Sequence, residues 1–203
     1  MKTLLIDTSC ENLLVILLDG DNRIVKKVEN ISTHSTMLLP VINEITDLSD
    51  IDYFGVCVGP GSFTGIRIGV STIKAFIYAL NKKAVSVSSL EILSYTKDNK
   101  KVLPVIDAKH TFYVAKYDEN KKVVLEPSCF TKEEVEKEKE FEVVTECNSL
   151  NVKPISIDEK VDGFIKAAKA KITNQEWDNT LEPVYILKSQ AERDLEKWLS
   201  IVI

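Results

Sequence analysis

The sequence is poor in the residues that build metal sites and disulfide frameworks. Its 203 residues include two histidines and four cysteines, and no two cysteines form a C-x-x-C pair. His34 and His110 are too far apart for the spacing of a helical metal site. Scattered single cysteines are typical of proteins from a reducing cytosol. We therefore predict no metal site, no disulfide framework and a cytoplasmic location.

The chain also lacks long apolar runs and an excess of positive charge. No apolar run approaches the roughly 20 residues of a membrane-spanning helix, and Asp7 interrupts the N-terminal segment too early for a signal peptide. The net charge is −5, whereas proteins that bind nucleic acid on their own usually present a basic surface. We expect no membrane association, and any role near RNA would depend on a partner.

Strand and helix patterns alternate along the first half of the chain. Apolar, β-rich runs at residues 2–7, 12–18 and 23–29, with an Asp-Gly turn after the second, predict an antiparallel meander. Helical periodicity and buried-strand patterns predict the elements that follow. These are a helix from Ser35 to about residue 48, a strand at 53–59, a helix at 64–81, a strand at 84–87 and a helix from Ser88 or Ser89 to about 95. Pro40 either kinks the first of these helices or delays its start.

The second half of the chain shows weaker patterns. The polar segment 97–101 is the best linker candidate, so we predict one lobe at residues 1–97 and a smaller one at 98–203. Within the second lobe we predict strands at 102–108, 112–118, 123–126, 141–145 and 154–157, helices at 132–139, 162–172 and 191–199, and an extended tail at 182–187. The predicted fold class is α/β with two lobes.

Five of the seven glycines fall within residues 55–69, at a strand-to-helix turn. Glycine permits positive φ and close backbone approach, so the backbone itself matters here. Three interpretations stay open. In the first interpretation, Gly59, Gly61 and Ser62 hold a phosphate at a helix N-terminus, although the Gly-Lys-Ser/Thr of a P-loop is absent. Alternatively, Gly65 and Gly69 form a helix face that admits a partner's helix. In the third, the glycines serve only the turn and internal packing.

A second candidate phosphate loop follows the first predicted strand. Asp7, Thr8 and Ser9 would form it, with Asp7 near a metal-bound phosphate. Equally, Asp7 is a carboxylate that ends a strand and accepts a hydrogen bond from the backbone of Thr8 or Ser9. A complete nucleotide site of this kind needs a glycine-bearing loop from each lobe, and the second lobe has only Gly163. At most half of a nucleotide site is expected.

Another titratable cluster follows the predicted strand at residues 102–108. Asp107, Lys109 and His110 lie at its end, near the expected cleft between the lobes. They are candidates for contact with a nucleotide or a partner.

Several of these segments together resemble a known family. They are TLLIDTS at residues 3–9, His34-Ser35 before LLP at 38–40, GPGSFTGIRIG at 59–69, Asp107-Ala108 and EPVY at 182–185. The chain resembles the TsaB/YeaZ family, the dimerisation subunit of the bacterial tRNA threonylcarbamoyladenosine complex. Lys109 and His110 depart from the arginines usual at that point.

The resemblance implies a fold of the actin/Hsp70/sugar-kinase (ASKHA) class with a shortened second lobe. It implies a non-catalytic subunit that pairs with a catalytic TsaD-type homologue and a small TsaE-type ATPase. That complex transfers a threonylcarbamoyl group to N6 of the tRNA adenosine beside the anticodon. The alternative left open by the residues is a stand-alone small-molecule kinase of the same fold.

The resemblance also implies a partner surface on the first-lobe helices. Its candidate residues are His34, Leu38, Gly65, Ile66, Arg67, Gly69 and Ile73. We expect no cofactor of the chain's own, ATP or ADP only as a ligand shared at the complex interface, and tRNA contact only through the complex. An unpaired apolar helix face makes a homodimer of the free chain plausible.

Overall fold

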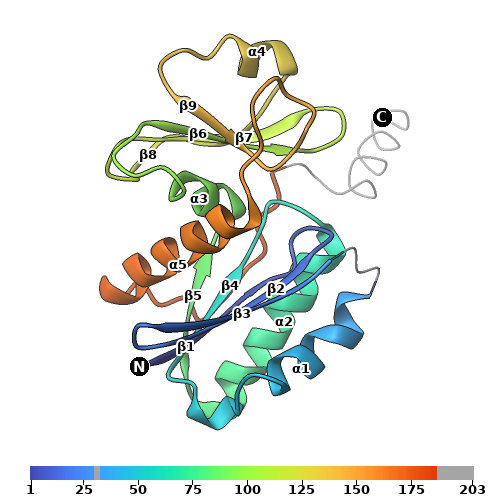
Figure 1. Ribbon diagram of the computed structural model, residues 1–203, viewed down its shortest axis with the longest axis vertical. Helices are drawn as coiled ribbons and strands as arrows, with labels where there is room; N and C mark the ends of the chain where they lie inside the picture. Colours follow the sequence, from blue (N-terminus) through green and yellow to red (C-terminus); the bar gives the residue numbers. More distant parts are fainter. Residues whose placement is uncertain (30–32, 187–203) are drawn as a thin grey trace, which may run out of the picture.

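The computed structural model describes residues 1–29 and 33–186, which form two mixed β-sheets with helices packed on both. Sheet A has the strand order β3-β2-β1-β4-β5, and sheet B has the order β8-β7-β6-β9. The two sheets lie at opposite ends of the molecule, with α3 and α5 between them (Figure 1). The architecture is the predicted two-lobed α/β fold.

Sheet A contains the predicted meander. β1 (Lys2–Asp7), β2 (Leu13–Asp19) and β3 (Asn22–Val28) pair antiparallel, and β4 (Tyr53–Cys57) and β5 (Lys83–Val87) extend the sheet in parallel from β1. The central strands are apolar on both faces because helices cover both. Asp7 thus ends the central strand β1, at the edge where the parallel strands β1, β4 and β5 all end.

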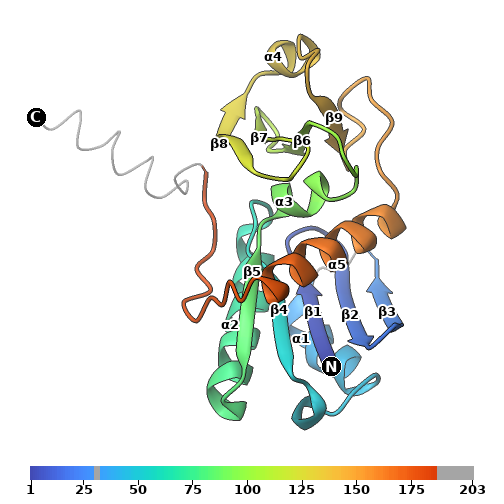
Figure 2. The same cartoon turned by 90° about the vertical axis from the view of Figure 1, so that its left-hand side faces the viewer.

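Helices from both halves of the chain cover sheet A. α1 (His34–Asn43) and α2 (Phe63–Leu80) pack on one face, and α5 (Ile157–Thr173) packs on the other (Figure 2). The side chains of Phe164 and Ala168 in α5 join the same apolar cluster as Leu5 of β1. Residues 178–184 also return to sheet A, where the Val184 amide donates to the Val58 carbonyl.

The predicted assignment of all residues 98–203 to a second lobe therefore does not hold for α5. The helix presents an apolar stripe that needs a large apolar surface, and the uncovered face of sheet A supplies it. The chain crosses to the second lobe, builds sheet B and then crosses back.

Sheet B consists of β6 (Val102–Asp107), β7 (Phe112–Tyr117), β8 (Val123–Phe130) and β9 (Glu142–Thr145). β6, β7 and β8 are antiparallel neighbours, and β9 pairs parallel with β6 at the sheet edge. α3 (Ser89–Ser94) packs under the inner face, and α4 (Lys132–Glu136) lies on the outer one.

Two local predictions are wrong. α1 begins at His34 and ends at Asn43, and Leu48–Asp50 forms a separate 3-10 turn, η1. Asp47 caps the start of η1, because its side chain accepts a hydrogen bond from the Ser49 amide. The predicted strand at 154–157 does not form, because Ser156 and Glu159 make a capping box that starts α5. The predicted helix at 191–199 lies outside the described residues.

α2 is long and apolar enough, by length and composition, to cross a bilayer. Its apolar residues are used for packing instead, since a stripe that includes Ile66, Val70, Ile73 and Ile77 is buried against sheet A. The core helix of a folded domain passes the same test, and we interpret α2 as such a helix.

Candidate functional site

The carboxylate of Asp7 is held by a lysine from the other end of the chain. Asp7 is only 1% exposed, and Lys160 of α5 is buried with it. Lys160 Nζ lies 2.9 Å from Asp7 Oδ2 and 3.0 Å from Glu146 Oε1, so one ammonium joins two carboxylates. The other Asp7 oxygen, Oδ1, accepts a hydrogen bond from the Ser9 amide at 2.8 Å, as one of the two predictions for Asp7 required.

This arrangement fixes the ionisation of both groups. Burial opposes the charge on Asp7, but the Lys160 ammonium and the hydrogen bonds from Ser9 outweigh it and lower the pKa of Asp7. Burial likewise opposes the charge on Lys160, but Asp7 and Glu146 raise its pKa well above the usual value. Both groups are charged at neutral pH, and the position of a cation beside Asp7 is filled by the chain itself.

The two candidate phosphate loops pack against each other. The Ser62 amide donates to the Ser9 carbonyl at 2.6 Å, and Thr8 Oγ1 donates to the Gly65 carbonyl at 2.7 Å. A Cβ added at Gly61 would lie 2.3 Å from the Ser9 carbonyl oxygen. The glycines are therefore required for close approach of the two loops, with no space left between them for a phosphate at these contacts.

Gly65 and Gly69 do not face a partner's helix. A Cβ at Gly65 would lie 1.9 Å from the Thr8 carbonyl oxygen, and one at Gly69 would lie 2.5 Å from Thr8 Oγ1. Their shared helix face thus packs on the end of β1 within the same chain. Of the three interpretations of the glycine-rich turn, internal packing is the one that the geometry supports.

The hydroxyl and backbone groups at the start of α2 also make contacts within the chain itself. Ser62 is the N-cap residue, and its Oγ accepts a hydrogen bond from the Gly65 amide at 3.2 Å. Gly59 has φ of +94°, a conformation that favours glycine, and a Cβ there would clash with Ile66. These residues are brought together as sequence analysis expected, but they serve to start a helix.

The remaining predicted partner-surface residues divide into buried and exposed. His34, Leu38, Ile66 and Ile73 are buried within the chain's own first lobe. Arg67 alone is exposed: its guanidinium lies 3.8 Å from the centre of the Phe63 ring. Its Nε also donates to the Tyr185 hydroxyl at 2.9 Å.

The exposed apolar residues of the same helices are not among the predicted site residues. On α1 these are Met37 and Leu39, and on α2 the most exposed is Tyr78, at 81%. They lie between the core positions of each helix. The sequence pattern that could have identified them is therefore an apolar residue out of phase with the buried stripe.

The two lobes enclose a cleft of about 430 Å³ beside Lys160. Its walls come from Cys10, Glu11 and Asn12 after β1, from the end of β6, and from Glu146 and Cys147 directly after β9. Asp107 lines it as expected, with its Oδ2 accepting from Ser149 Oγ at 2.7 Å and its Oδ1 from the Lys109 amide. Lys109 and His110 are exposed and are not among the lining residues.

Fold and site together define a two-lobed α/β protein of the ASKHA class with a shortened second lobe. The solved structure of YeaZ from Pseudomonas aeruginosa has the same fold, with a TM-score of 0.73 and 23% identity over 91% of this chain and 100% of that one. A second solved structure is that of an uncharacterized protein with similarity to the peptidase YeaZ from Pseudomonas aeruginosa. It has a TM-score of 0.73 and 20% identity over 92% of this chain and 99% of that one.

Sequence comparison gives the family. The family model for TsaD, tRNA N6-adenosine threonylcarbamoyltransferase, matches residues 29–144. A "tRNA threonylcarbamoyladenosine biosynthesis protein TsaB" of Buchnera aphidicola (subsp. Acyrthosiphon pisum) is 37% identical over 98 residues, 43% of this chain and 44% of that protein. The TsaB of Bacillus subtilis is 35% identical over 100 residues, which are 46% of this chain and 44% of that protein.

The TsaD model covers more than half of the chain, which therefore belongs to this family, and its TsaB and YeaZ matches place it in the TsaB/YeaZ branch. The chain spans less than half the length of these two curated relatives.

Proposed function

We propose that this chain is the non-catalytic partner subunit of a cytoplasmic complex that makes N6-threonylcarbamoyladenosine beside the anticodon of tRNA. The observation that carries the non-catalytic assignment is the ion pair between Asp7 and Lys160. A carboxylate that serves a metal-bound phosphate must face the metal or its water shell. In this chain an ammonium at 2.9 Å takes that place.

The charges of the interlobe cleft support the same proposal. Three of its lining residues, Glu11, Asp107 and Glu146, carry carboxylates. Lys160, the ammonium beside the cleft, already contacts two carboxylates. Such a cleft repels the phosphates of ATP. For the alternative of a stand-alone kinase, Asp7 is already paired with Lys160 and the described lining of the cleft offers no basic phosphate site, and no observation favours it.

The outward-facing residues of α1 and α2 are the proposed partner surface. Met37, Leu39 and Tyr78 are large apolar side chains that the chain leaves exposed, as is typical of protein interfaces. Arg67, stacked on Phe63, extends this surface to the start of α2. The TsaD-type subunit binds here, and the same surface closes a homodimer when the partner is absent. The TsaE-type ATPase joins this pair, any ATP or ADP lies at the shared interface, and tRNA is contacted through the complex.

Reconstitution tests the proposal. The purified chain alone should form no modified tRNA, and adding it to the TsaD-type subunit, the TsaE-type ATPase and the threonylcarbamoyl donor should restore the modification. Leu39→Glu should abolish co-elution with the TsaD-type subunit. The control is Val124→Glu, at a similarly exposed apolar residue of β8 in sheet B, which should pair normally.

Two results would contradict the proposal. If Leu39→Glu pairs as the unmodified chain does, the partner surface is elsewhere. If the chain alone hydrolyses ATP and Asp7→Asn stops it, the kinase alternative is correct.

A further inference from the structure

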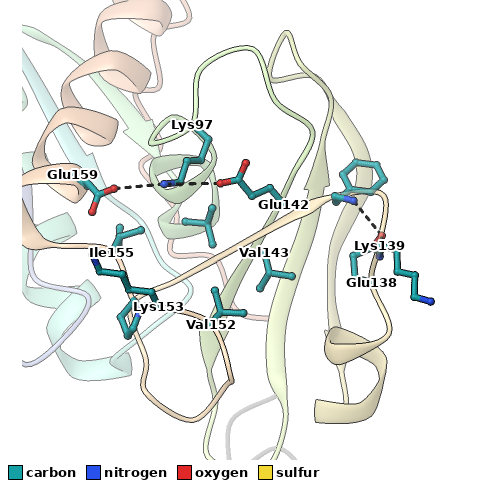
Figure 3. A pocket seen from close by; sticks show the side chains of 12 residues that line it. Lys97, Glu138, Lys139, Glu142, Val143, Val152, Lys153, Ile155 and Glu159 are labelled. Atoms are coloured by element: carbon teal, nitrogen blue, oxygen red, sulfur yellow. Dashed lines mark hydrogen bonds and ion pairs between the residues drawn. The ribbon is translucent and has the colours of Figure 1, made fainter.

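A second groove lies in the second lobe, away from the α1 and α2 surface. It has a volume of about 540 Å³ and lies between the strand β9 and the segment that leads into α5 (Figure 3). Its walls are residues 141–144, residues 152–155 and the side chains of Lys97, Glu138, Lys139 and Glu159. This volume falls within the range of ligand-binding clefts.

One wall of the groove is the outer edge of β9, which is hydrogen-bonded to the following segment only at its end. Among the described strands, β9 lies at the edge of sheet B and pairs only with β6. The Glu142 amide donates to the Lys101 carbonyl on the β6 side, and the Thr145 carbonyl accepts from the Ile155 amide on the other side. Because backbone groups alternate along a strand, the amide and carbonyl of Val143 point to the outer side, where β9 has no neighbouring strand.

The middle of the groove is apolar. Phe141 and Val144 are buried beneath it, and Val143, Val152 and Ile155 are half-buried at its surface. Edge strands with exposed backbone and apolar neighbours are the sites at which extended peptides add to a sheet.

The three lysines that line the groove differ in whether they are paired with a carboxylate. Each lining glutamate has a basic partner: Glu138 pairs with Lys116, while Glu142 and Glu159 both lie within 4.0 Å of Lys97 Nζ. Within the described part of the chain, Lys139 and Lys153 have no such carboxylate partner, and both are exposed. In Figure 3 they lie on opposite sides of Val143 and Val152. The groove therefore offers an unpaired ammonium on each side of an apolar centre.

We propose that this groove binds an extended peptide segment of a partner protein, apolar at its centre and acidic at both ends, by adding it to β9. The backbone of the peptide pairs with Val143, its apolar centre covers Val143 and Val152, and its carboxylates pair with Lys139 and Lys153. This interaction surface is independent of the proposed role in tRNA modification and of the surface on α1 and α2.

A designed peptide tests the proposal with the full-length chain. The probe is fluorescein-labelled Glu-Glu-Val-Val-Val-Glu-Glu, and binding is followed by fluorescence anisotropy, with backbone amide shifts from NMR as the second readout. We expect saturable binding that weakens with added salt, and a shift of the Val143 amide. N-methylation of the central valine of the peptide removes one backbone donor and should weaken binding about threefold to tenfold.

Charge reversal separates the groove from non-specific attraction. Lys139→Glu and Lys153→Glu should each weaken the peptide about twofold to fivefold, the range for exposed ion pairs. Lys122→Glu is the matched control, since Lys122 is exposed but does not line the groove; it should bind as the unmodified chain does. All three positions are exposed, so the variants should keep their fold.

The proposal is overturned if the acidic peptide does not bind. It is equally overturned if Lys-Lys-Val-Val-Val-Lys-Lys binds as well, or if N-methylation has no effect. Binding of a single-stranded RNA of about 10 nucleotides that depends on Lys139 and Lys153, with no binding of the peptide, would assign the lysines to nucleic acid instead.

Discussion

Replacing Lys160 by methionine tests whether the buried ion pair organises the site. Methionine keeps most of the side-chain volume but removes the ammonium, which leaves the buried carboxylate of Asp7 without a cation. Breaking a buried ion pair by removing one partner costs about 3–5 kcal/mol. For a chain of about 200 residues this corresponds to a fall in Tm of roughly 6–20 °C.

The pH dependence distinguishes loss of charge from loss of packing. In the unmodified chain the pKa of Asp7 is lowered, so its contribution to stability is present above the unfolded pKa of about 3.9 and is lost as pH falls through the folded pKa. In Lys160→Met the hydrogen bonds from Ser9 remain but the ammonium is lost, so burial, the largest of the causes, should raise the pKa of Asp7 above about 3.9. The variant's destabilisation should then be largest near neutral pH and smaller near pH 4.

The assay is urea unfolding of each variant at pH 7 and near pH 4, with a double-mutant cycle. Asp7→Asn combined with Lys160→Met should be more stable than Lys160→Met alone, because the uncompensated charge is gone. The matched control is Lys166→Met on the same helix, whose ion pair with Asp98 is exposed and should contribute less than about 1 kcal/mol. The reasoning is refuted if Lys160→Met costs no more than Lys166→Met, or if its cost does not depend on pH.

Three further predictions concern other parts of the structure. Gly65→Ala would place a Cβ 1.9 Å from the Thr8 carbonyl oxygen, so thermal denaturation should show a loss of about 1–3 kcal/mol; unchanged stability would show that the two loops do not touch. Tyr78→Glu, at an exposed position of α2, should leave Tm unchanged but reduce self-association in sedimentation velocity, and an unaltered dimer would exclude Tyr78 from that surface. Although burial opposes the charge of Glu138, the hydrogen bond from Lys116 lowers its pKa to about 2. Between pH 4.5 and 2 the unmodified chain should therefore lose stability more steeply than Glu138→Gln, and parallel pH profiles would contradict this pKa.

Local patterns were sufficient to predict most of the strands and helices. Each strand of sheet A lies within two residues of its predicted bounds, because alternating or continuous apolar runs and the turn at Gly20 determine it locally. The packing of α5 could not be predicted in the same way. Its pattern shows an apolar stripe but not which surface will cover it, and the covering residues, such as Leu5 and Leu14, lie about 150 positions earlier.

The candidate site was predicted in part. Clustered glycines correctly indicated that the backbone approaches something closely near residue 65. Spacing alone could not distinguish a partner's helix from the chain's own Thr8, since either contact requires a residue without a side chain. Lys160 was missed because α5 is rich in lysine. Its position could have indicated its role. Lys160 lies four residues before Phe164, on the buried stripe of the helix, where an unpaired ammonium would lower the stability of the fold.

The ion triad also connects the two sheets, and this bears on how the chain works. Asp7 ends β1 of sheet A, Glu146 directly follows β9 of sheet B, and Lys160 contacts both carboxylates. Separating the two lobes would break the contact between Lys160 and Glu146 and leave the buried ammonium with one carboxylate instead of two, which opposes the separation. Enzymes that close two domains around a substrate must also open them to release product. A lysine that joins the lobes opposes such opening, whereas it suits a subunit whose task is to present a fixed helical surface. Lys160→Met should consequently increase hydrogen exchange at the ends of both β1 and β9; an increase at β1 alone would show that the lysine stabilises one lobe without joining the two.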